Sequence, residues 1–483
     1  MLSTIIYMIV DSVKTSLIQK DLVFSWIQTT QTRLDTLLEQ PNITLGHIEE
    51  LLEAQARDLM LPILSAAAQK RAEQQPFECP KCQVALQVEA RHRSRTLDGI
   101  FGSFPLKRDY GLCPKCKSYW HPADQALGLQ PQAPASPRVQ EISALMSLRT
   151  PYAQAAQDTQ RLTGLSLNAS SMHREAQRQG QRAIQCREMD VALTHTPEGV
   201  VELSARSATA QISPFTLIIE IDAWNIRERD DWGQSAKLRK NGQEPERWHW
   251  VFTGTIFRLD QCAKTKGGRR LITQRGYVAT RQSLEAFTLQ LYTEAILRGL
   301  LHAEQVLILA DGAIWIWNLA QARFKEAKQR VDLFHVREHL HELARVLHGQ
   351  GTPEAQKWLQ PLLRFLEKRK DGALDVLHHL EDLRLRLKNM PALQQEALEK
   401  EIGYFTTHHK RMDYKQAKAN GEPVGSGAVE STARQYQTRF KCTGQFWTLA
   451  GDEALLTLAT LYRNERWHRL FPHARPPAKG ADG

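Results

Sequence analysis

The stretch VLILADGAIWIWNL, residues 306–319, is apolar up to a single aspartate and then takes on a helical pattern. The apolar run before Asp311 is typical of a buried strand, and the residues after it suit a helix. We therefore expect the Asp311 carboxylate at the edge of a sheet. Two explanations fit this residue taken alone. It can cap the following helix, because Asp is favoured at helix starts, or it can belong to a site assembled with other acids.

Strand and helix patterns alternate around this stretch. Three β-like runs precede it: FTLIIEIDAW (215–224), RWHWVFTGTIFRL (247–259) and RLITQRGYVAT (270–280). A helix is expected at about 282–300, and after the strand and helix around Asp311 the run RVDLFHV (330–336) is expected as a last strand. In this order, we expect the first and fourth strands to lie side by side in a ribonuclease-H-like α/β sheet.

Three acids suggest a metal site. The strand LIIEID ends at Asp222 as LILA ends at Asp311, and Glu430 opens a helix after VGSGAV. Clustered carboxylates repel unless cations lie between them, and two Mg²⁺ ions about 3.5–4 Å apart do this in phosphodiester chemistry. Glu430 alone is explained as well by a favourable acid at a helix N-terminus. The three acids together favour a two-metal site.

The chain resembles a bacterial insertion-sequence transposase of the DDE type, in the Kra-type group related to Mutator-like elements. HHKRMDYKQAKANGEPVGSGAVEST is similar to the family's segment around its catalytic glutamate, and LADGAIWIWNL to its second-aspartate segment. VDLFHVREHL is similar to the segment that follows, with Asp332 and His335 in the D-x-x-H spacing known from Mutator-like relatives. The resemblance covers nearly the whole chain. It implies that Asp222, Asp311 and Glu430 form a catalytic triad that binds Mg²⁺ (or Mn²⁺).

The segment around the first aspartate, IDAWNIRERDDW, departs from the family, which more often has a glycine directly after that aspartate. Asp230 and Asp231 are therefore alternatives to Asp222, although neither ends an apolar strand. His335 could act in catalysis by orienting DNA or the scissile phosphate, or it could be an ordinary core or surface histidine. The two tryptophans after Asp311 fit core packing better than base stacking.

Two identical CPKC tetrapeptides are separated by 30 residues. Four thiolates in two C-x-x-C pairs close a tetrahedral zinc site, and the duplication argues against a redox pair or coincidence. The basic, strand-like segment between the pairs suits a zinc ribbon. We expect one structural Zn²⁺ on Cys79, Cys82, Cys113 and Cys116; the remaining cysteines, Cys186, Cys262 and Cys442, are scattered.

A basic helix follows the zinc ribbon. Arg174, Arg178 and Arg182 are four residues apart and line one helix face. Their helix is the third of a group at 138–187, where a helix-turn-helix protein places its recognition helix. A solvated charged face explains the arginines almost as well, but the nearby zinc ribbon favours DNA. Lys410 and Arg411 are further candidates for phosphate contacts.

Composition sets the limits of these interpretations. A chain of 483 residues allows about three domains, and 42% hydrophobic residues provide for packed cores. The net charge of +10 favours a polyanionic partner such as nucleic acid. At the N-terminus, MLSTIIYMIVDSVKTSLIQK is interrupted well before the roughly 20 apolar residues that a membrane span needs. We expect an ordinary first helix there, no membrane partner, and a cytoplasmic, nucleoid-associated bacterial protein.

We expect a multidomain α+β chain. Its segments are N-terminal helices (1–76), a zinc ribbon (77–128), a helix-turn-helix-like DNA-binding domain (138–190), the first part of the catalytic core (213–336), an all-helical insertion (337–420), the last part of the core with Glu430 (421–468) and a disordered basic tail (469–483). The proline-rich stretch LQPQAPASP (129–137) is expected to be a linker.

The resemblance implies a DNA transposase that binds the ends of its mobile element, cleaves them and joins the freed 3′ ends to target DNA. It also implies double-stranded DNA as the partner and a homodimer or larger assembly on it. Two alternatives remain: a non-catalytic, sequence-specific DNA-binding regulator, and a metal-dependent DNA nuclease without strand transfer. Inverted repeats flanking the coding region would favour transposition over both.

Overall fold

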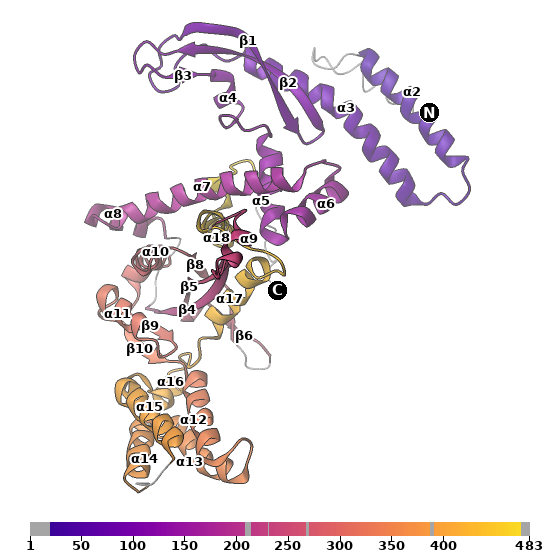
Figure 1. Ribbon diagram of the computed structural model, residues 1–483. Helices are drawn as coiled ribbons and strands as arrows, with labels where there is room; N and C mark the ends of the chain where they lie inside the picture. The colour runs from indigo at the N-terminus through magenta and orange to yellow at the C-terminus, as the bar shows by residue number, and fades with distance from the viewer. Residues whose placement is uncertain (1–19, 208–213, 230, 267–269, 387–390, 475–483) are drawn as a thin grey trace. The chain divides into compact units, whose positions relative to one another are not determined.

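The computed structural model describes residues 20–207, 214–229, 231–266, 270–386 and 391–474 (Figure 1). They divide into two compact units, one within Met1–Glu175 and one within Ala176–Pro472. The expected helix at the very N-terminus lies outside the described residues. Within the described ranges, no helix combines the length and the apolar character that a membrane crossing requires.

The first unit contains two long helices and a small antiparallel sheet. The helices are α2 (Lys20–Leu38) and α3 (Leu45–Glu73), and the sheet has the order β1 (Gln87–Gly99), β2 (Gly102–Leu112), β3 (Tyr119–Trp120), followed by α4 (Pro122–Ala126). Leu97, Phe104 and Leu106 of the sheet are buried against apolar residues of α3. The hydrophobic core of this sheet is therefore formed together with α3, the helix that precedes it in the chain.

Three helices complete this part of the chain: α5 (Pro137–Arg149), α6 (Tyr152–Thr163) and α7 (Ala169–Leu193), the last continuing into the second unit. A glycine turn and an asparagine cap separate α6 from α7. Gly164 ends α6 in the left-handed region, with φ of 66°, and the Asn168 side chain accepts a hydrogen bond from the N–H of Ser171 at 2.8 Å. Such a cap satisfies one of the free N–H groups at a helix start.

The proposed linker at 129–137 is wrong. Ala133 and Ala135 are buried. The N–H of Asp98 donates to the carbonyl of Pro134 at 2.8 Å, and the N–H of Ser136 donates to the carbonyl of Asp98 at 2.9 Å. The stretch is thus an irregular extension of the sheet along β1, because its backbone supplies hydrogen bonds that the strand edge lacks.

The second unit is built on a five-stranded mixed sheet in the order β10-β9-β4-β5-β8. The strands are β4 (Thr216–Glu228), β5 (Arg247–Arg258), β8 (Gly276–Thr280), β9 (Gln305–Ala310) and β10 (Lys328–Val331). β4, β9 and β10 are parallel, and β5 runs antiparallel to β4 and β8. The first and fourth expected strands, now β4 and β9, do lie side by side, with Ile221 opposite Ala310.

Three strand boundaries differ from the sequence expectation. β4 does not end at Asp222 but continues to Glu228, because β5 pairs with it along its full length. The run at 270–280 forms two strands: β7 (Arg270–Ile272) pairs with β6 (Cys262–Lys264) in a separate hairpin, and only β8 joins the main sheet. β10 ends at Val331, because the Asp332 side chain caps a helix at the N–H of Phe334.

Helices cover both faces of the sheet. On one face, α10 (Leu284–Leu297) and α11 (Ile314–Arg323) pack on β5, where Phe252 stacks on Phe287 at 5.5 Å between ring centroids. Trp317 is buried in the core, and Trp315 packs on Phe252, so the expectation of core packing for these two tryptophans is confirmed. On the other face lies α17 (Gly427–Phe440), while α18 (Leu449–Arg463) packs on β8.

Between β10 and α17 the chain is helical: α12 (Leu333–His348), α13 (Pro353–Lys368), α14 (Gly372–Arg386), α15 (Ala392–His408) and α16 (Tyr414–Ala419). Two shorter helices are α8 (Pro197–Ala205) and α9 (Ser235–Lys240). The fully buried Arg330 of β10 links the sheet to the segment between α15 and α17, where it donates to Asp413, Glu422 and the carbonyl of Pro423.

The expectation of a disordered tail from residue 469 is wrong for its first residues. Leu470 and Phe471 are buried, with exposed fractions of 3% and 1%. Apolar side chains of this kind hold the chain in place after α18. Residues 475–483 lie outside the described residues.

Candidate active site and zinc centre

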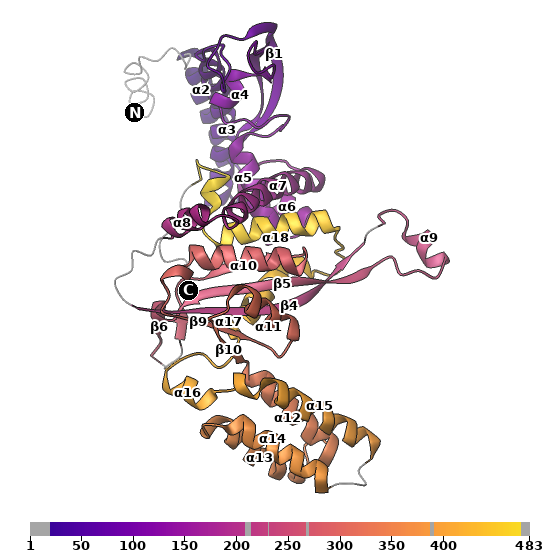
Figure 2. The same cartoon turned by 90° about the vertical axis from the view of Figure 1, so that its left-hand side faces the viewer.

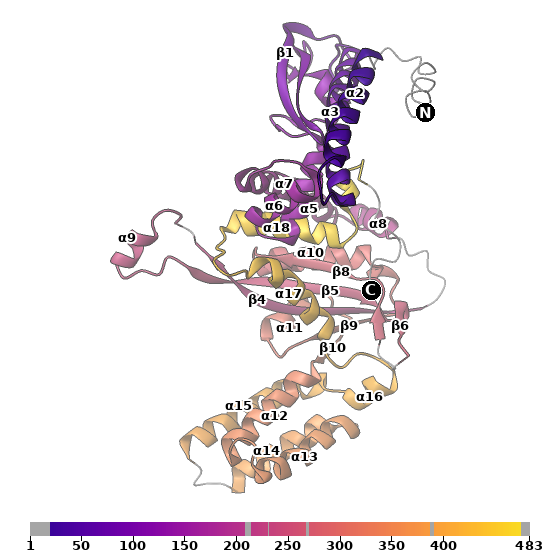
Figure 3. The same cartoon turned by 90° about the vertical axis from the view of Figure 1, so that its right-hand side faces the viewer.

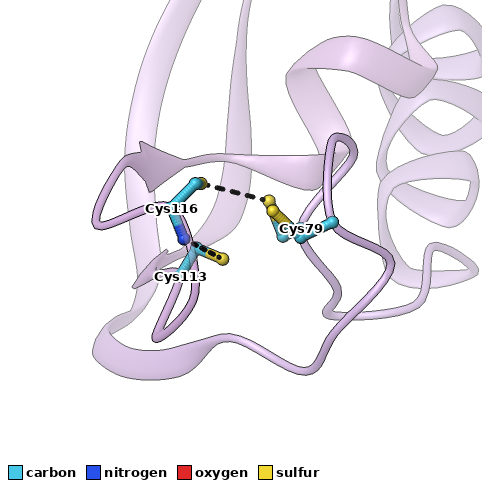
Figure 4. A group of neighbouring side chains, drawn as sticks. Cys79, Cys113 and Cys116 are labelled. Atoms are coloured by element: carbon cyan, nitrogen blue, oxygen red, sulfur yellow. Dashed lines mark hydrogen bonds between the residues drawn. The ribbon is translucent and has the colours of Figure 1, made fainter.

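The four cysteines of the CPKC pairs converge. Their sulfur atoms all lie within 4.8 Å of one another, and Sγ of Cys79 lies 3.7 Å from Sγ of Cys116 (Figure 4). Tetrahedral Zn²⁺ with Zn–S bonds of about 2.3 Å places its sulfur ligands about 3.8 Å apart. Cys79, Cys82, Cys113 and Cys116 therefore fit a structural Zn²⁺ site.

Both pairs are held by the same backbone turn. The residue after the second cysteine has a positive φ in each, 54° at Gln83 and 57° at Lys117. Its N–H donates to the carbonyl of the first cysteine, at 2.9 and 3.0 Å. Positive φ is uncommon outside glycine, so its recurrence shows that the geometry is duplicated along with the tetrapeptide. Ser118 lowers the pKa of the Cys116 thiol to about 6 by hydrogen bonding, which favours the thiolate that a metal binds.

We expect one zinc ion per chain in the purified protein, and its loss in Cys79→Ser. Metal ligation is coupled to local folding, so amide exchange in residues 77–122 should accelerate in this variant while the second unit keeps its protection. Elemental analysis and hydrogen exchange by mass spectrometry measure both effects. Cys442→Ser is the matched control and should keep its zinc. Zinc-free protein with all four thiols readily alkylated under native conditions would contradict the site.

Asp222, Asp311 and Glu430 come from three different elements. Asp222 lies within β4, and one of its oxygens accepts the N–H of Ala223 at 2.7 Å. Asp311 directly follows β9, and its Oδ1 accepts the N–H of Ala313 at 2.9 Å. Ala313 is itself the N-cap residue of α11, which has no side-chain cap, so Asp311 stabilises the turn before the helix and is not its cap. Glu430 lies in the first turn of α17, with 39% of its side chain exposed.

These acids influence one another. Burial raises the pKa of Asp222, and the charges of Asp311 and Glu430 raise it further, whereas His335 lowers it. The oxygens of the three acids do not, however, all lie within 4.8 Å of one another. Among the described carboxylates and histidines, the group that meets this distance is Asp332, His335 and Glu430. The structure thus brings Glu430 beside His335. Asp222, Asp311 and Glu430 lie less close together than they would if all three acids bound one ion.

The neighbouring Asp332 carboxylate favours the protonated form of His335. Its Nδ1 lies 3.7 Å from Oδ2 of Asp332, and the Asp332 carboxylate raises the pKa of His335 to about 9. An imidazolium has no free nitrogen lone pair for a metal. With His335 protonated, Asp332 and His335 form an ion pair, and the imidazolium edge, 38% exposed, suits an anion such as a phosphate.

Two buried acids that the sequence analysis did not assign to the site hold the start of α17. Glu220, two residues before Asp222, is 1% exposed and accepts the N–H of Val429 at 2.9 Å. Asp332 is fully buried, and its Oδ2 accepts both the N–H and the hydroxyl of Ser426 at 2.5 Å. The first N–H groups of a helix have no partner within it. Glu220 and Asp332 therefore fix the turn from which Glu430 projects.

The sequence did contain a signal for Glu220. It is the one charged residue inside the apolar run TLIIEI of β4, and a charged residue is almost never fully buried without partners. Burial raises the pKa of Glu220 to about 8, while the N–H groups of Val429 and Ala428 act in the opposite direction. A carboxyl inside a strand thus points to a backbone group that needs an acceptor.

The proposed DNA-binding cations fall into two groups. Arg174 and Lys410 are exposed, and the Arg174 guanidinium group donates to the hydroxyl of Ser171, one turn earlier in α7, at 3.3 Å. Arg182 donates to Gln179 at 2.7 Å and to the carbonyl of Leu470 at 3.3 Å. Arg411 and Arg178 are half-buried, and Arg411 donates to Gln329 at 2.8 Å. Arg182 and Arg411 therefore have contacts within the protein that explain them without DNA.

No known protein-family model matches the chain, and no curated protein matches it. Among solved structures, it is similar to a chain described as the Drosophila P element transposase strand transfer complex, with 10% sequence identity over 68% of this chain and 92% of that chain. The TM-score is 0.34. The candidate site therefore depends on the geometry described above.

Replacing Glu220 by leucine should loosen the start of α17. The buried N–H of Val429 would lose its acceptor, at a cost of about 1–3 kcal/mol, and exchange at the amides of Ala428 and Val429 should accelerate. Glu220→Gln keeps a carbonyl acceptor of the same shape and should preserve the protection. Hydrogen exchange by NMR or mass spectrometry makes the comparison. Equal protection in the wild type and both variants would show that Glu220 does not hold this turn.

Proposed function

We propose that the chain is a DNA transposase of the DDE type and that its second unit carries a ribonuclease-H-like catalytic domain. The observation that carries this proposal is the parallel pairing of β4 with β9, in which Ile221 lies opposite Ala310. An aspartate follows each of these two residues in the sequence: Asp222 follows Ile221, and Asp311 follows Ala310. Neighbouring parallel strands thus deliver two carboxylates to the same level of one sheet.

The strand order supports the same domain assignment. An antiparallel group, β4, β5 and β8, is followed along the chain by helix α10, strand β9, helix α11 and strand β10, with β9 inserted next to β4. This is the order expected for a ribonuclease-H-like sheet. The helical segment between β10 and α17 fits an insertion that precedes the glutamate. Membership of the Kra-type group of insertion-sequence transposases is supported by the sequence motifs.

The acids fit divalent cations. The raised pKa of Asp222 shows that burial and like charges oppose its ionisation, and hard divalent cations with oxygen ligands offset such repulsion. In this proposal, Asp222, Asp311 and Glu430 hold Mg²⁺ or Mn²⁺. When bound, the ions supply activation of the attacking oxygen and stabilisation of the departing oxygen in phosphodiester transfer. The chain's own residues orient the reaction: His335⁺ contacts a phosphate, and Glu220 and Asp332 position Glu430.

In the first unit, we propose that the zinc ribbon and the helices α5 to α7 bind the ends of the element as double-stranded DNA, with Arg174 among the contacts. Lys410 is a further phosphate contact in the second unit. Joining two ends requires two catalytic sites in one complex, so we propose a homodimer or larger assembly on DNA. The alternatives, a non-catalytic regulator and a nuclease without strand transfer, are outcomes of the experiment that follows.

Asp222→Asn, Asp311→Asn and Glu430→Gln should each abolish cleavage and joining in Mg²⁺ while leaving end binding intact. These substitutions keep shape but remove the charge that holds the cations. We expect rates to fall by more than about 100-fold, since even residues that only orient a metal ligand contribute 10–100-fold. Gel shift measures binding, and cleavage and strand-transfer assays on end-containing DNA measure chemistry. Mn²⁺, which tolerates less ideal ligand sets, should restore a trace of activity.

Asp231→Asn is the matched control, because Asp231 is the described alternative first aspartate and is exposed away from the sheet; Asp230 lies outside the described residues. It should remain active. Normal cutting by Asp222→Asn beside an inactive Asp231→Asn would show that the first catalytic acid is misassigned. A wild-type protein that binds ends but never cuts would be a regulator, and one that cuts without joining would be a nuclease.

Two arginines of α7 provide a further comparison. Arg174→Ala should weaken binding to end DNA and make the dependence of log affinity on log salt shallower by about 0.9, the value for one lost phosphate contact. Arg182→Ala removes hydrogen bonds to Gln179 and Leu470, so it should lower the melting temperature and leave the salt slope unchanged. Fluorescence anisotropy over a salt series and thermal unfolding separate the two. An unchanged slope in Arg174→Ala would make this helix face merely solvated.

A further inference from the structure

The hairpin formed by β4 and β5 extends beyond the rest of the sheet. β9 pairs with β4 only as far as Ile221, and β8 pairs with β5 only from Phe252 onward. The outer part, residues 225–229 and 231–250, is a two-stranded ribbon with α9 near its tip (Figure 2, Figure 3). We call these residues the arm. The β4 edge of the arm is held by Trp447, whose carbonyl accepts the N–H of Arg229 at 2.8 Å.

The arm exposes tryptophans. The chain has 11 tryptophans, all within the described residues. Those that are more than half exposed, Trp232 at 53%, Trp248 at 60% and Trp250 at 56%, all lie on the arm. Trp248 and Trp250 alternate in β5 and therefore share one face of the ribbon. Clustered large aromatic side chains at the surface mark a place where a partner binds.

The same surface is cationic. The guanidinium group of Arg227 lies 5.3 Å from the ring centre of Trp248, and that of Arg229 lies 5.4 Å from the ring centre of Trp232. Glu246 forms ion pairs with Arg227, Arg229 and Arg239 at once, so a single carboxylate faces three guanidinium groups. Outside the buried Glu228, the arm's described residues carry six cations, Arg227, Arg229, Lys237, Arg239, Lys240 and Arg247, and three acids, Asp231, Glu244 and Glu246.

We propose that the arm binds unpaired nucleotides of DNA, with bases stacked on Trp248 and Trp250 and phosphates on the surrounding arginines and lysines. Aromatic platforms among cations are the means by which proteins bind single strands without reading their sequence. Residues two apart in a strand are about 6.6–6.8 Å apart, which is twice the roughly 3.4 Å rise per nucleotide. The spacing therefore leaves room for one base between the two rings.

The arm's position suits this partner. Trp250 pairs with Asn225, three residues beyond Asp222 and thus about 10 Å along the strand. Nucleotides held there lie about 10 Å along β4 from Asp222, on the face of the ribbon opposite to the one that Asp222 shares with α17. A second copy of the chain fits less well, because two arms facing each other would bring like charges together. The identity of the nucleic acid as DNA rests on the proposed function.

The test uses the full-length, zinc-containing protein without Mg²⁺, so that it does not depend on cleavage. The probes are a labelled oligothymidylate about 16 nucleotides long, the upper site size of one single-strand-binding fold, and a blunt duplex of the same length. The variants are a Trp248→Ala, Trp250→Ala double substitution and the corresponding double substitution to phenylalanine, which keeps a stacking ring. The exposed positions of both residues make each variant compatible with the fold, and thermal unfolding verifies it.

We expect the alanine variant to bind oligothymidylate at least tenfold more weakly, in line with about 1–3 kcal/mol of stacking per base, while its duplex affinity is unchanged and the phenylalanine variant retains most of its affinity. Unchanged oligothymidylate binding in the alanine variant would overturn the proposal. So would an equal loss on the duplex, or a change of oligomeric state in sedimentation. The transposase proposal has a separate test. It would fail if Asp222→Asn, Asp311→Asn and Glu430→Gln still cut and joined DNA, and the binding measured here does not depend on that result.

Discussion

The parallel pairing of β4 with β9 is the contact on which the rest of the second unit depends. It places Asp222 and Asp311 at the same level of the sheet, since Ile221 and Ala310 are directly opposite. It also ends at this point, because β9 stops while β4 continues to Glu228. Past the end of β9, the free edge of β4 is bridged instead by Trp447. The end of one strand thus marks both the candidate catalytic edge and the root of the arm.

Burying a carboxylate costs free energy of folding, and in this site the hydrogen bonds that the buried carboxylates accept offset that cost. Glu220 and Asp332 lose their hydration, but each accepts N–H groups at the start of α17 that have no partner in the helix. Removing either acceptor would leave a buried N–H group unsatisfied as well as shifting Glu430. Glu430, the candidate catalytic glutamate, is exposed enough to reach a ligand because two other acids, both buried, fix its helix from the sheet side.

Much of this arrangement could be predicted from the sequence, and the misses have physical causes. Apolar runs determined the strand order, and the two CPKC motifs predicted the cysteine cluster. The end of β4 was missed because Asn225, Arg227 and Glu228 interrupt the apolar run, and their pairing with β5 becomes visible only in the structure. Trp248 and Trp250 belong to a run that is typical of any strand, and their exposure follows from where the neighbouring strands stop. From the sequence, Asp332 was expected inside a strand, because a capping residue can be recognised only when the structure shows which N–H group donates to its side chain.

Side-chain alternation along β4 connects these features. Glu220 and Asp222 share the face that meets α17, where Glu220 contacts Val429 and the Thr255 hydroxyl of β5 donates to Thr432 at 2.9 Å. Asn225 and Arg227 lie on the opposite face, across from Trp250 and Trp248. A slip of one residue in the pairing would reverse both faces, moving Asp222 away from Glu430 and burying cations of the arm. The register of one strand therefore fixes the candidate metal site and the arm surface together, so that neither can be moved without the other.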